Sequence, residues 1–238
     1  MAKRPIFIPS TKAPFFEKQE VEFQWHPGFS LSQKQKSVSS LHQSASERLQ
    51  VSNTLEVSTK SPTRLGNQLS AFNLPGFTTD RDYLSLREFS LETIFQTSKV
   101  FSHNIKCKDL IRLEELEIRK EIREREKKHL SHFELEGEVW ELQPVGAFYN
   151  YLYIRSLLQF EEFIDALIQH DSFTDIAFNP ETSFNCQAES VSQLVGLLKA
   201  GVNTQEVLSS KQNFLKLVYD EESSPSVKSE INDQLELF

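Results

Sequence analysis

The amino-acid sequence predicts an α+β fold, in which one helix-rich domain with a few short strands is followed by a disordered C-terminal tail. Hydrophobic residues make up 38% of the 238 positions and aromatic residues 11%, and 19 phenylalanines stand against 7 glycines, which suffices for a sizeable core. Apolar residues recur at helical spacing through much of the chain, and strand-like alternation is confined to short segments. We therefore place the domain at residues 1–220 and the tail at residues 221–238.

The N-terminal part of the chain is expected to combine short strands with one helix. Residues 5–9 and 21–26 are typical of strands, the second because apolar and polar residues alternate along it. Apolar residues recur at helical spacing over residues 30–50, although the many serines make this only a modest helix former. Residues 55–58 predict a further strand, and the proline and glycine content of residues 61–76 predicts an ordered loop.

Helices dominate the rest of the domain. Ser90 is the expected N-cap of an amphipathic helix, and opposite charges at spacings of three and four over residues 108–130 favour a long exposed helix. Residues 132–142 alternate about Gly137, as a hairpin does. The remaining expected elements are one or two buried helices within 147–169, a strand at 174–180, and helices at 190–200 and 203–220, the last capped by Asn203.

Composition excludes several classes of protein. No apolar run has the length that crosses a bilayer, and the opening MAKRPIFIPS is too interrupted by proline for a signal peptide, so we expect a cytoplasmic protein without membrane contact. The cysteines Cys107 and Cys186 are far apart, and no zinc-site spacing occurs, so neither a metal nor another cofactor is expected. A net charge of −8 argues against a protein that coats nucleic acid, so any such contact must be local.

The segment SLETIFQTSK, residues 90–99, carries an acid, an amide and an amine in one row. Spacings of four and three residues place Glu92, Gln96 and Lys99 on the same stripe of the expected helix, opposite its broad apolar side. Helices carry such stripes on solvated faces as well, so the spacing alone leaves a structural and a functional interpretation open.

This segment resembles the motif S-x-E-H-x-F-Q-x-x-K of the NADAR family. The matching residues are Ser90, Glu92, Phe95, Gln96 and Lys99. Thr93 stands where the motif has histidine, which leaves the identity of the proton donor open. Upstream, QLSAFNL resembles the L-S-N-F segment of the same family through Leu69, Ser70 and Phe72, with Ala71 in place of asparagine.

Longer stretches resemble the branch of NADAR proteins encoded beside DarT-type DNA ADP-ribosyltransferase toxins. They are WHPGFSLSQKQKSVSSLH, LSAFNL, FSLETIFQTSKVF, LQPVGAFYNYLYIRSLL and FTDIAFNPETSFNCQA, and the similarity runs from about Pro5 to the end of the last helix. The resemblance implies a helix-rich, YbiA-like α+β fold and an N-glycosidase that strips ADP-ribose from guanine bases in DNA, acting as the antitoxin. Two alternatives remain: an N-glycosidase for a small ribosylated riboflavin-pathway intermediate, and a non-catalytic reader of ADP-ribosylated DNA tethered to the sliding clamp.

Glycosidic cleavage builds positive charge on the ribose, so the site needs a carboxylate near the anomeric carbon and a means of moving a proton. The resemblance assigns Glu92 to activate water or to stabilise the oxocarbenium-like state. It assigns Gln96 and Lys99 to orient ribose or phosphate, and it places Ser70 and Phe72 among the substrate-binding residues. For Lys99 two alternatives stay open: an ion pair with a nearby acid, or a Schiff base to an opened ribose, for which the sequence gives no support.

A second carboxylate is expected in the segment FTDIAFNPETSFNCQA. Asp175 and Asn185 lie in the part that resembles a later block of the family, and Asp175 either takes part in catalysis or caps a turn before Pro180. Lys34 and Lys36 either face the diphosphate or a DNA strand or belong to a solvated helix face.

Aromatic side chains could stack on a base, although residues of this type more often belong to the core. The candidates for stacking are Trp25, Phe72, Tyr149 and Tyr151.

The last five residues, QLELF, resemble the pentapeptide Q-L-x-L-F by which bacterial proteins bind the replication sliding clamp. In that interpretation Gln234 hydrogen-bonds at the rim of a groove, and Leu235, Leu237 and Phe238 are buried in it. The partners expected from the sequence are therefore ADP-ribosylated DNA, the cognate DarT-type toxin and the sliding clamp.

Overall fold

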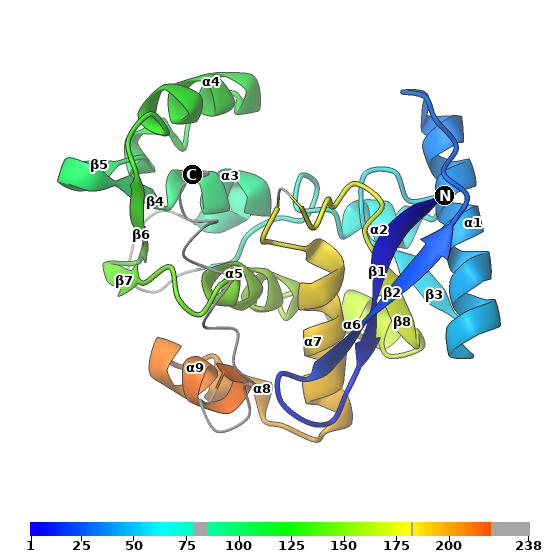
Figure 1. Ribbon diagram of the computed structural model, residues 1–238. Helices are drawn as coiled ribbons and strands as arrows, with labels where there is room; N and C mark the ends of the chain where they lie inside the picture. The colour runs from blue at the N-terminus through cyan, green and yellow to red at the C-terminus, as the bar shows by residue number, and fades with distance from the viewer. Residues whose placement is uncertain (79–84, 182, 220–238) are drawn as a thin grey trace.

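The computed structural model describes residues 1–78, 85–181 and 183–219, and it confirms a single domain of the α+β class. Two four-stranded sheets lie on opposite sides of a central group of helices (Figure 1). No helix in the described part of the chain is long and apolar enough to cross a membrane.

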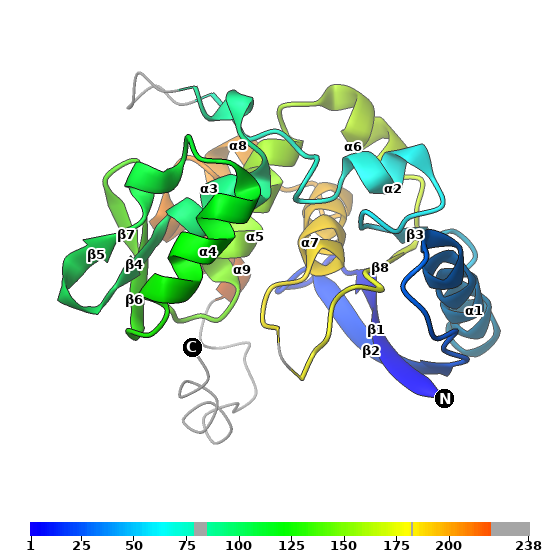
Figure 2. The same cartoon turned by 90° about the horizontal axis from the view of Figure 1, so that it is seen from above.

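The first sheet has the strand order β2-β1-β8-β3. β1 (Ala2–Pro9) pairs antiparallel with β2 (Phe16–Phe23) and with β8 (Ser172–Thr174), and β8 runs parallel to β3 (Thr54–Glu56). α1 (Leu31–Leu49) covers one face and α7 (Gln187–Lys199) the other, and α7 also packs against α5 (Ala147–Leu157) at the centre of the molecule (Figure 2). Because side chains alternate along β1, Ile6 joins the core under α1 and Phe7 the core under α7.

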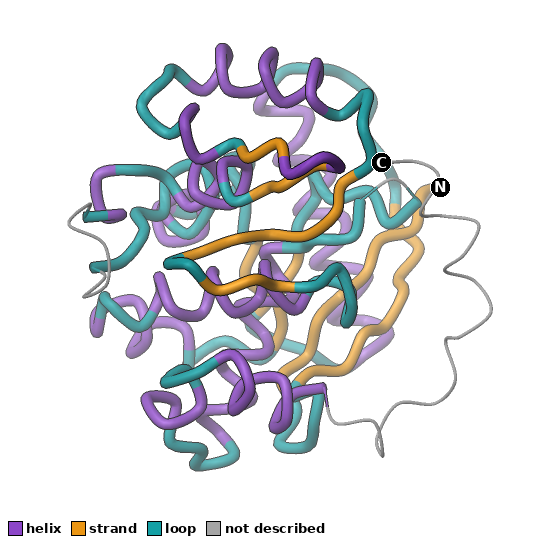
Figure 3. Tube along the Cα trace, turned by 90° about the vertical axis from the view of Figure 1, so that its left-hand side faces the viewer, coloured by secondary structure: helices purple, strands orange, loops and turns teal. Residues whose placement is uncertain are grey.

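The second sheet has the order β5-β4-β6-β7 and is antiparallel throughout. Its strands are β4 (Lys99–Phe101), β5 (Ile105–Lys106), β6 (Leu130–Leu135) and β7 (Glu138–Trp140), and Figure 3 views the molecule from the side on which they lie. β6 and β7 form the expected hairpin, and Gly137 at its turn has a φ of 78°, a conformation that favours glycine. α4 (Glu115–Arg125) packs on this sheet through Ile118 and Ile122.

The remaining helices of the described chain are short. They are α2 (Arg64–Gln68), α3 (Leu91–Thr97), α6 (Glu161–Leu167), α8 (Thr204–Val207) and α9 (Lys211–Tyr219). α5 is buried at all its residues but Arg155, which confirms one buried helix within 147–169, whereas α6, in the same range, buries only Leu167.

Several expected boundaries were wrong for identifiable reasons. The helix that Ser90 caps ends at Thr97, and Lys99 is the first residue of β4, so Glu92, Gln96 and Lys99 do not share one helix. The strand expected at 174–180 was wrong: β8 spans Ser172–Thr174, and the backbone turns directly after it, where the side chain of Asp175 accepts hydrogen bonds from the amides of Ala177 and Phe178.

Longer segments were also divided differently. Residues 61–76, expected as a loop, contain α2, whose N-terminus is capped by the Thr63 side chain. The single helix expected over 108–130 is a short 3-10 helix, Lys108–Leu110, followed by α4, and the helix expected over 203–220 is divided into α8 and α9. The expected tail, 221–238, lies outside the described residues.

Candidate active site

A pocket of about 440 Å³ lies between α3, the segment that follows α2, and the loop between β8 and α7. It brings together residues that are far apart in the sequence. Those that the sequence singled out are Phe72, Glu92, Gln96, Lys99, Tyr149, Asp175 and Asn185. Ser70 is fully buried next to this segment, and its hydroxyl has no hydrogen-bond partner among the described residues.

Helix α3 presents Glu92 to the pocket. The Ser90 hydroxyl accepts a hydrogen bond from the Thr93 amide at 3.2 Å, which caps the helix, and the Glu92 amide donates to the Ala71 carbonyl at 2.9 Å. Gln96 Nε2, one turn along the helix, donates to Glu92 Oε1 at 2.8 Å. The second oxygen of Glu92 has no hydrogen-bond partner in the part of the chain that the structure describes.

Burial raises the pKa of Glu92. The hydrogen bond from Gln96 and the positive charges of Lys99 and Arg119 oppose this shift without cancelling it. A carboxyl group with a raised pKa is a stronger base when it is ionised, and an uncommitted oxygen can take a proton from a neighbouring molecule. Glu92 therefore has both the environment and the free atom that proton transfer needs.

Lys99 reaches the same pocket from β4. Its ammonium group forms an ion pair with Glu126 at 3.0 Å and lies 6.0 Å from the centre of the Phe95 ring. The sequence predicted that Lys99 lies near Glu92, but it attributed this to helical spacing, whereas the chain turns from α3 into β4 between them.

Asp175 serves as a turn cap and a pocket carboxylate at once. Its Oδ1 accepts hydrogen bonds from the amides of Ala177 and Phe178 at 3.0 and 3.2 Å, and its Oδ2 accepts one from Gln187 Nε2 at 3.0 Å. Gln187 is itself oriented by the Ala71 amide, which donates to Gln187 Oε1 at 2.6 Å. Because all three groups around Asp175 are donors, they favour the ionised carboxylate, although burial raises its pKa to about 6.

A second buried acid, Glu56, stands behind Asp175. Glu56 Oε1 accepts hydrogen bonds from the Ser58 hydroxyl at 2.6 Å and the Ile176 amide at 2.8 Å, and Oε2 accepts one from the Thr174 hydroxyl at 2.7 Å. Burial, with the charge of Asp175, raises the pKa of Glu56 to about 8. Sequence analysis missed this residue, although an acid between Leu55 and Val57 in a short apolar strand was the available signal.

Aromatic rings form much of the pocket wall. Tyr149, from α5, meets Phe95 edge-on with ring centres 5.1 Å apart, and Phe72 and Phe178 also line the pocket. Tyr151, the neighbouring stacking candidate, instead packs 4.6 Å from Trp140, and its hydroxyl donates to the Leu208 carbonyl, so it belongs to the core.

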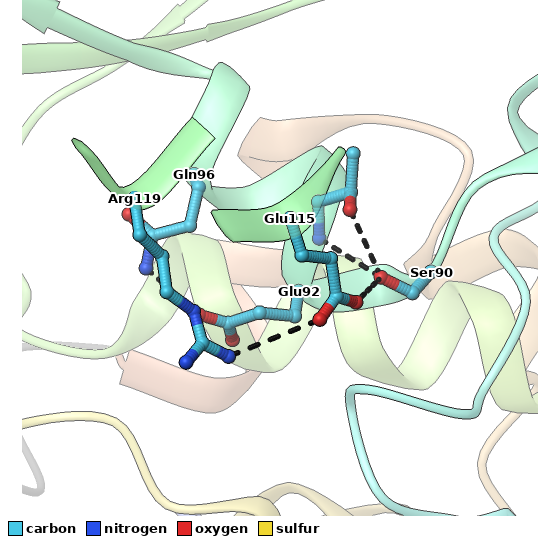
Figure 4. Close-up of polar contacts among 6 residues, drawn as sticks. Ser90, Glu92, Gln96, Glu115 and Arg119 are labelled. Carbon is cyan, nitrogen blue, oxygen red and sulfur yellow. Dashed lines mark hydrogen bonds and ion pairs between the residues drawn. The ribbon is translucent and has the colours of Figure 1, made fainter. Parts of the chain in front are cut away.

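Helix α4 adds a charged pair that the sequence assigned to a solvated face (Figure 4). The guanidinium group of Arg119 lies 5.1 Å from the centre of the Phe72 ring and 3.9 Å from Glu115, and the Ser90 hydroxyl lies 3.3 Å from Glu115 Oε1. Thr93 borders a small cavity, about 10 Å³, together with Glu115 and Arg119, and does not line the main pocket. The position of the motif histidine therefore lies toward α4 in this chain.

The other candidates lie elsewhere. Lys34 is placed 4.5 Å from the centre of the Trp25 ring, and Lys36 lines a separate groove, so neither lysine lines the main pocket. Residues 234–238 lie outside the described residues. Among those described, no group of three or more His, Cys, Asp or Glu side chains is arranged to hold a metal ion.

Comparison with known proteins identifies a family to which the chain is similar. Residues 2–228 match the family model described as DarT1-associated NADAR antitoxin. The match covers every residue that lines the pocket and leaves residues 234–238 outside. No curated protein matches the chain.

Proposed function

The chain belongs to the DarT1-associated NADAR antitoxin family, and from this membership and the geometry of the pocket we propose that it is an N-glycosidase that removes ADP-ribose from guanine bases in DNA. Membership assigns it the role of an antitoxin to a DarT toxin. The observation that carries the enzymatic proposal is the presence of two carboxyl groups, Glu92 and Asp175, with different hydrogen-bonding states in one pocket.

The two carboxyl groups are suited to different tasks. Both oxygens of Asp175 are occupied by donors, so it supplies a fixed negative charge that stabilises the positive charge developing on the ribose. Glu92 has one free oxygen and a raised pKa, so it exchanges the proton. This division agrees with the general requirement of glycosidic cleavage for one charge-stabilising group and one acid or base.

In the proposed reaction the bond between the anomeric carbon and the guanine nitrogen breaks as the oxygen of a water molecule bonds to that carbon. Glu92 accepts the proton that the water loses, and the guanine nitrogen takes up a proton from solvent. The products are free ADP-ribose and unmodified guanine. Gln96 holds Glu92 Oε1 in place by its hydrogen bond, which leaves the other oxygen available to accept this proton.

The size and lining of the pocket suit part of a nucleotide. A volume of about 440 Å³ lies within the usual range for ligand sites, and the rings of Phe72 and Tyr149 offer surfaces against which a base or ribose can pack. The positive charges of Lys99 and Arg119 both act on Glu92, and such cations can bind a diphosphate.

The decisive experiment is release of free ADP-ribose from an oligonucleotide that carries one ADP-ribosylated guanine, with chelator present. We expect release by the wild type and a loss of about 10²- to 10⁴-fold in kcat for Glu92→Gln, the range for removal of a general base. Glu117→Gln, which removes the same charge from the exposed face of α4, is the matched control and should retain full activity.

Other outcomes would redirect the assignment. Full activity in Glu92→Gln would remove Glu92 from the mechanism. Tight binding of the modified oligonucleotide without release would make the protein a reader of ADP-ribosylated DNA. Cleavage of a small ribosylated riboflavin-pathway intermediate, with none of the oligonucleotide, would favour the metabolic alternative.

A further inference from the structure

A cationic and aromatic surface lies around the start of α1, apart from the pocket. We name it the Trp25 surface. Its residues are Arg4, Trp25, Phe29, Lys34 and Lys36. The Trp25 ring is contacted by two cations, with Lys34 Nζ 4.5 Å and the Arg4 guanidinium carbon 5.7 Å from the ring centre. Trp25 itself is held against Phe23 of the core with ring centres 6.1 Å apart, so it fixes both cations at the edge of the first sheet.

The cations of this surface are not held in ion pairs within the described residues, although the charge of Arg4 acts on Asp175. Arg4, Lys34 and Lys36 form no ion pair with any residue that the structure describes, and Glu22 pairs with Lys3 instead, at 3.6 Å. Residues 1–64 contain 9 lysines and arginines against 5 acids, whereas the whole chain has a net charge of −8. The N-terminal quarter is therefore locally positive in an acidic protein.

The groove beside this surface has the chemistry of a polar ligand site. It measures about 570 Å³, and it is lined by Lys36 and by amide and hydroxyl side chains that include Gln24, Gln35, Ser39 and Gln43. No acidic residue lines it among those that the structure describes. Amides, hydroxyls and lysines are the groups that contact phosphate and sugar along a nucleic-acid strand.

Phe29 supplies an exposed aromatic ring just before α1, three residues before Ser32, which lines the groove. It is fully exposed, and it directly precedes Ser30, the N-cap of α1. The first turn of α1 contains no acidic residue, so the partial positive charge of the helix N-terminus adds to that of the lysines. An exposed ring beside cations is suited to stacking on a base while the neighbouring phosphates are bound.

The beginning of β1, which carries Arg4 of the Trp25 surface, lies on the same side of the molecule as the loop between β8 and α7, which lines part of the pocket. In Figure 1 the beginning of β1 and the loop between β8 and α7 both lie in the upper half, and Figure 2 shows that side from above. β1 runs antiparallel to β8, so its first residues lie beside the segment that carries Asp175. Arg4 is close enough for its charge to act on Asp175, and Arg4 Nε is buried without a hydrogen-bond partner among the described residues. Arg4 thus links the two regions.

We propose that the Trp25 surface binds the DNA strand that flanks the modified guanine, with Lys34 and Lys36 on its phosphates and Phe29 against an unpaired base. This inference rests on the proposed function, because it assumes that the base in the pocket belongs to a polynucleotide. A strand is favoured over an acidic protein because the residues that line the groove are, apart from Pro62, of polar or basic types, whereas the core of a protein interface is rich in apolar side chains.

The first test measures binding of a short, unmodified, fluorescent single-stranded oligonucleotide by anisotropy at several NaCl concentrations. Lys34→Gln combined with Lys36→Gln should weaken binding about tenfold. It should also reduce the slope of log affinity against log salt by about 1.4, because each lysine that neutralises one phosphate contributes ~0.7 to that slope. Phe29→Ser should weaken binding without changing the slope. Lys199→Gln combined with Lys216→Gln, an equal charge change on exposed residues at the far end of α7 and on α9, is the matched control and should change neither quantity.

The second test compares kcat/KM for ADP-ribose release from the modified oligonucleotide and from ADP-ribosylated guanosine, which has no flanking phosphates. The double lysine variant should lose about tenfold on the oligonucleotide and nothing on the nucleoside. If the wild type cleaves neither substrate, the proposed function fails, while the binding test still decides the role of the surface. An affinity and salt slope equal to those of the control would overturn the proposal, as would loss of toxin binding in the lysine variant with DNA binding unchanged.

Discussion

Replacing Glu56 by glutamine should remove a large part of the pH dependence of stability. Glu56 is fully buried, and burial raises its pKa from 4.5 to about 8. In the unfolded chain the group loses its proton near its ordinary pKa, whereas the folded protein retains that proton until about pH 8. The unfolded state therefore binds fewer protons between these values, and the free energy of unfolding falls as the pH rises.

One such proton changes the free energy of unfolding by about 1.4 kcal/mol per pH unit, so raising the pH from 6 to 8 lowers the free energy of unfolding by up to about 3 kcal/mol. Glutamine imitates the protonated acid. The side-chain oxygen of glutamine can accept a hydrogen bond from the Ile176 amide, and its amide nitrogen can donate one to the Thr174 hydroxyl oxygen. The Thr174 hydroxyl then donates to His42 Nε2, which lies 2.8 Å from the Thr174 oxygen in the wild type. His42 can accept because burial lowers its pKa to about 4 and keeps it neutral. We therefore expect Glu56→Gln to fold and to gain stability relative to wild type as the pH rises.

The assay is urea unfolding at pH 6, 7 and 8, followed by tryptophan fluorescence, on wild type, Glu56→Gln and the exposed control Glu117→Gln. Other buried acids also make the free energy of unfolding depend on pH. The test therefore compares the pH slopes of the three proteins and does not interpret the slope of one protein alone. Wild type and Glu117→Gln should lose stability in parallel, and Glu56→Gln should lose less by about 1.4 kcal/mol per unit. Equal slopes for all three proteins would show that Glu56 is ionised at neutral pH, and would refute the reasoning.

Three further predictions concern the site and the tail. The rate of ADP-ribose release should rise with pH through the pKa of Glu92, which lies above the ordinary value for glutamate. Measured from pH 4.5 to 9, Glu92→Gln should lose that rise and keep only the rise that follows ionisation of Asp175, whose pKa is about 6. Phe72→Ala should weaken binding of the modified oligonucleotide about tenfold, as loss of one stacking surface does, and Phe72→Tyr should bind as tightly as the wild type. Fluorescence anisotropy measures both affinities. Deletion of residues 234–238 should abolish binding to the sliding clamp in calorimetric titration, because it removes three apolar side chains whose burial contributes roughly 1.5–3 kcal/mol each. The deletion should leave ADP-ribose release intact. Unchanged clamp binding would show that these residues do not bind the clamp.

Local patterns predicted the elements of this fold better than their ends. The helix of residues 30–50 and the hairpin about Gly137 were confirmed because periodicity, capping and turn chemistry act within a few residues. The end of β8 was wrong because the turn there depends on a buried side chain, Asp175, that is held by Gln187 from another element. Interactions of this kind have no signature in a local pattern.

The residues of the candidate site that belong to a motif were predicted, and those that only the packing of distant segments brings to the site were missed. Glu92, Gln96 and Asp175 were named from the sequence, and they do line one pocket. Glu56 was missed because its partners are Thr174 and Ile176, more than a hundred residues away. Distant residues of this kind become neighbours only once β3 and β8 pair, which no single-sequence pattern shows.

The surroundings of Thr93 decide whether threonine in place of the motif histidine weakens the enzymatic proposal. If the missing histidine had been an acid or base in the pocket, its replacement by threonine would favour a non-catalytic reader. Thr93 instead lies on the side of α3 toward α4, where Ser90, Glu115 and Arg119 surround it, while Glu92 borders both that region and the main pocket. The side chain at this position therefore faces α4, which carries Arg119, and the positive charge of Arg119 acts on Glu92. A residue change at this position is therefore compatible with an intact pair of carboxyl groups, and the departure by itself gives no reason to prefer recognition over catalysis.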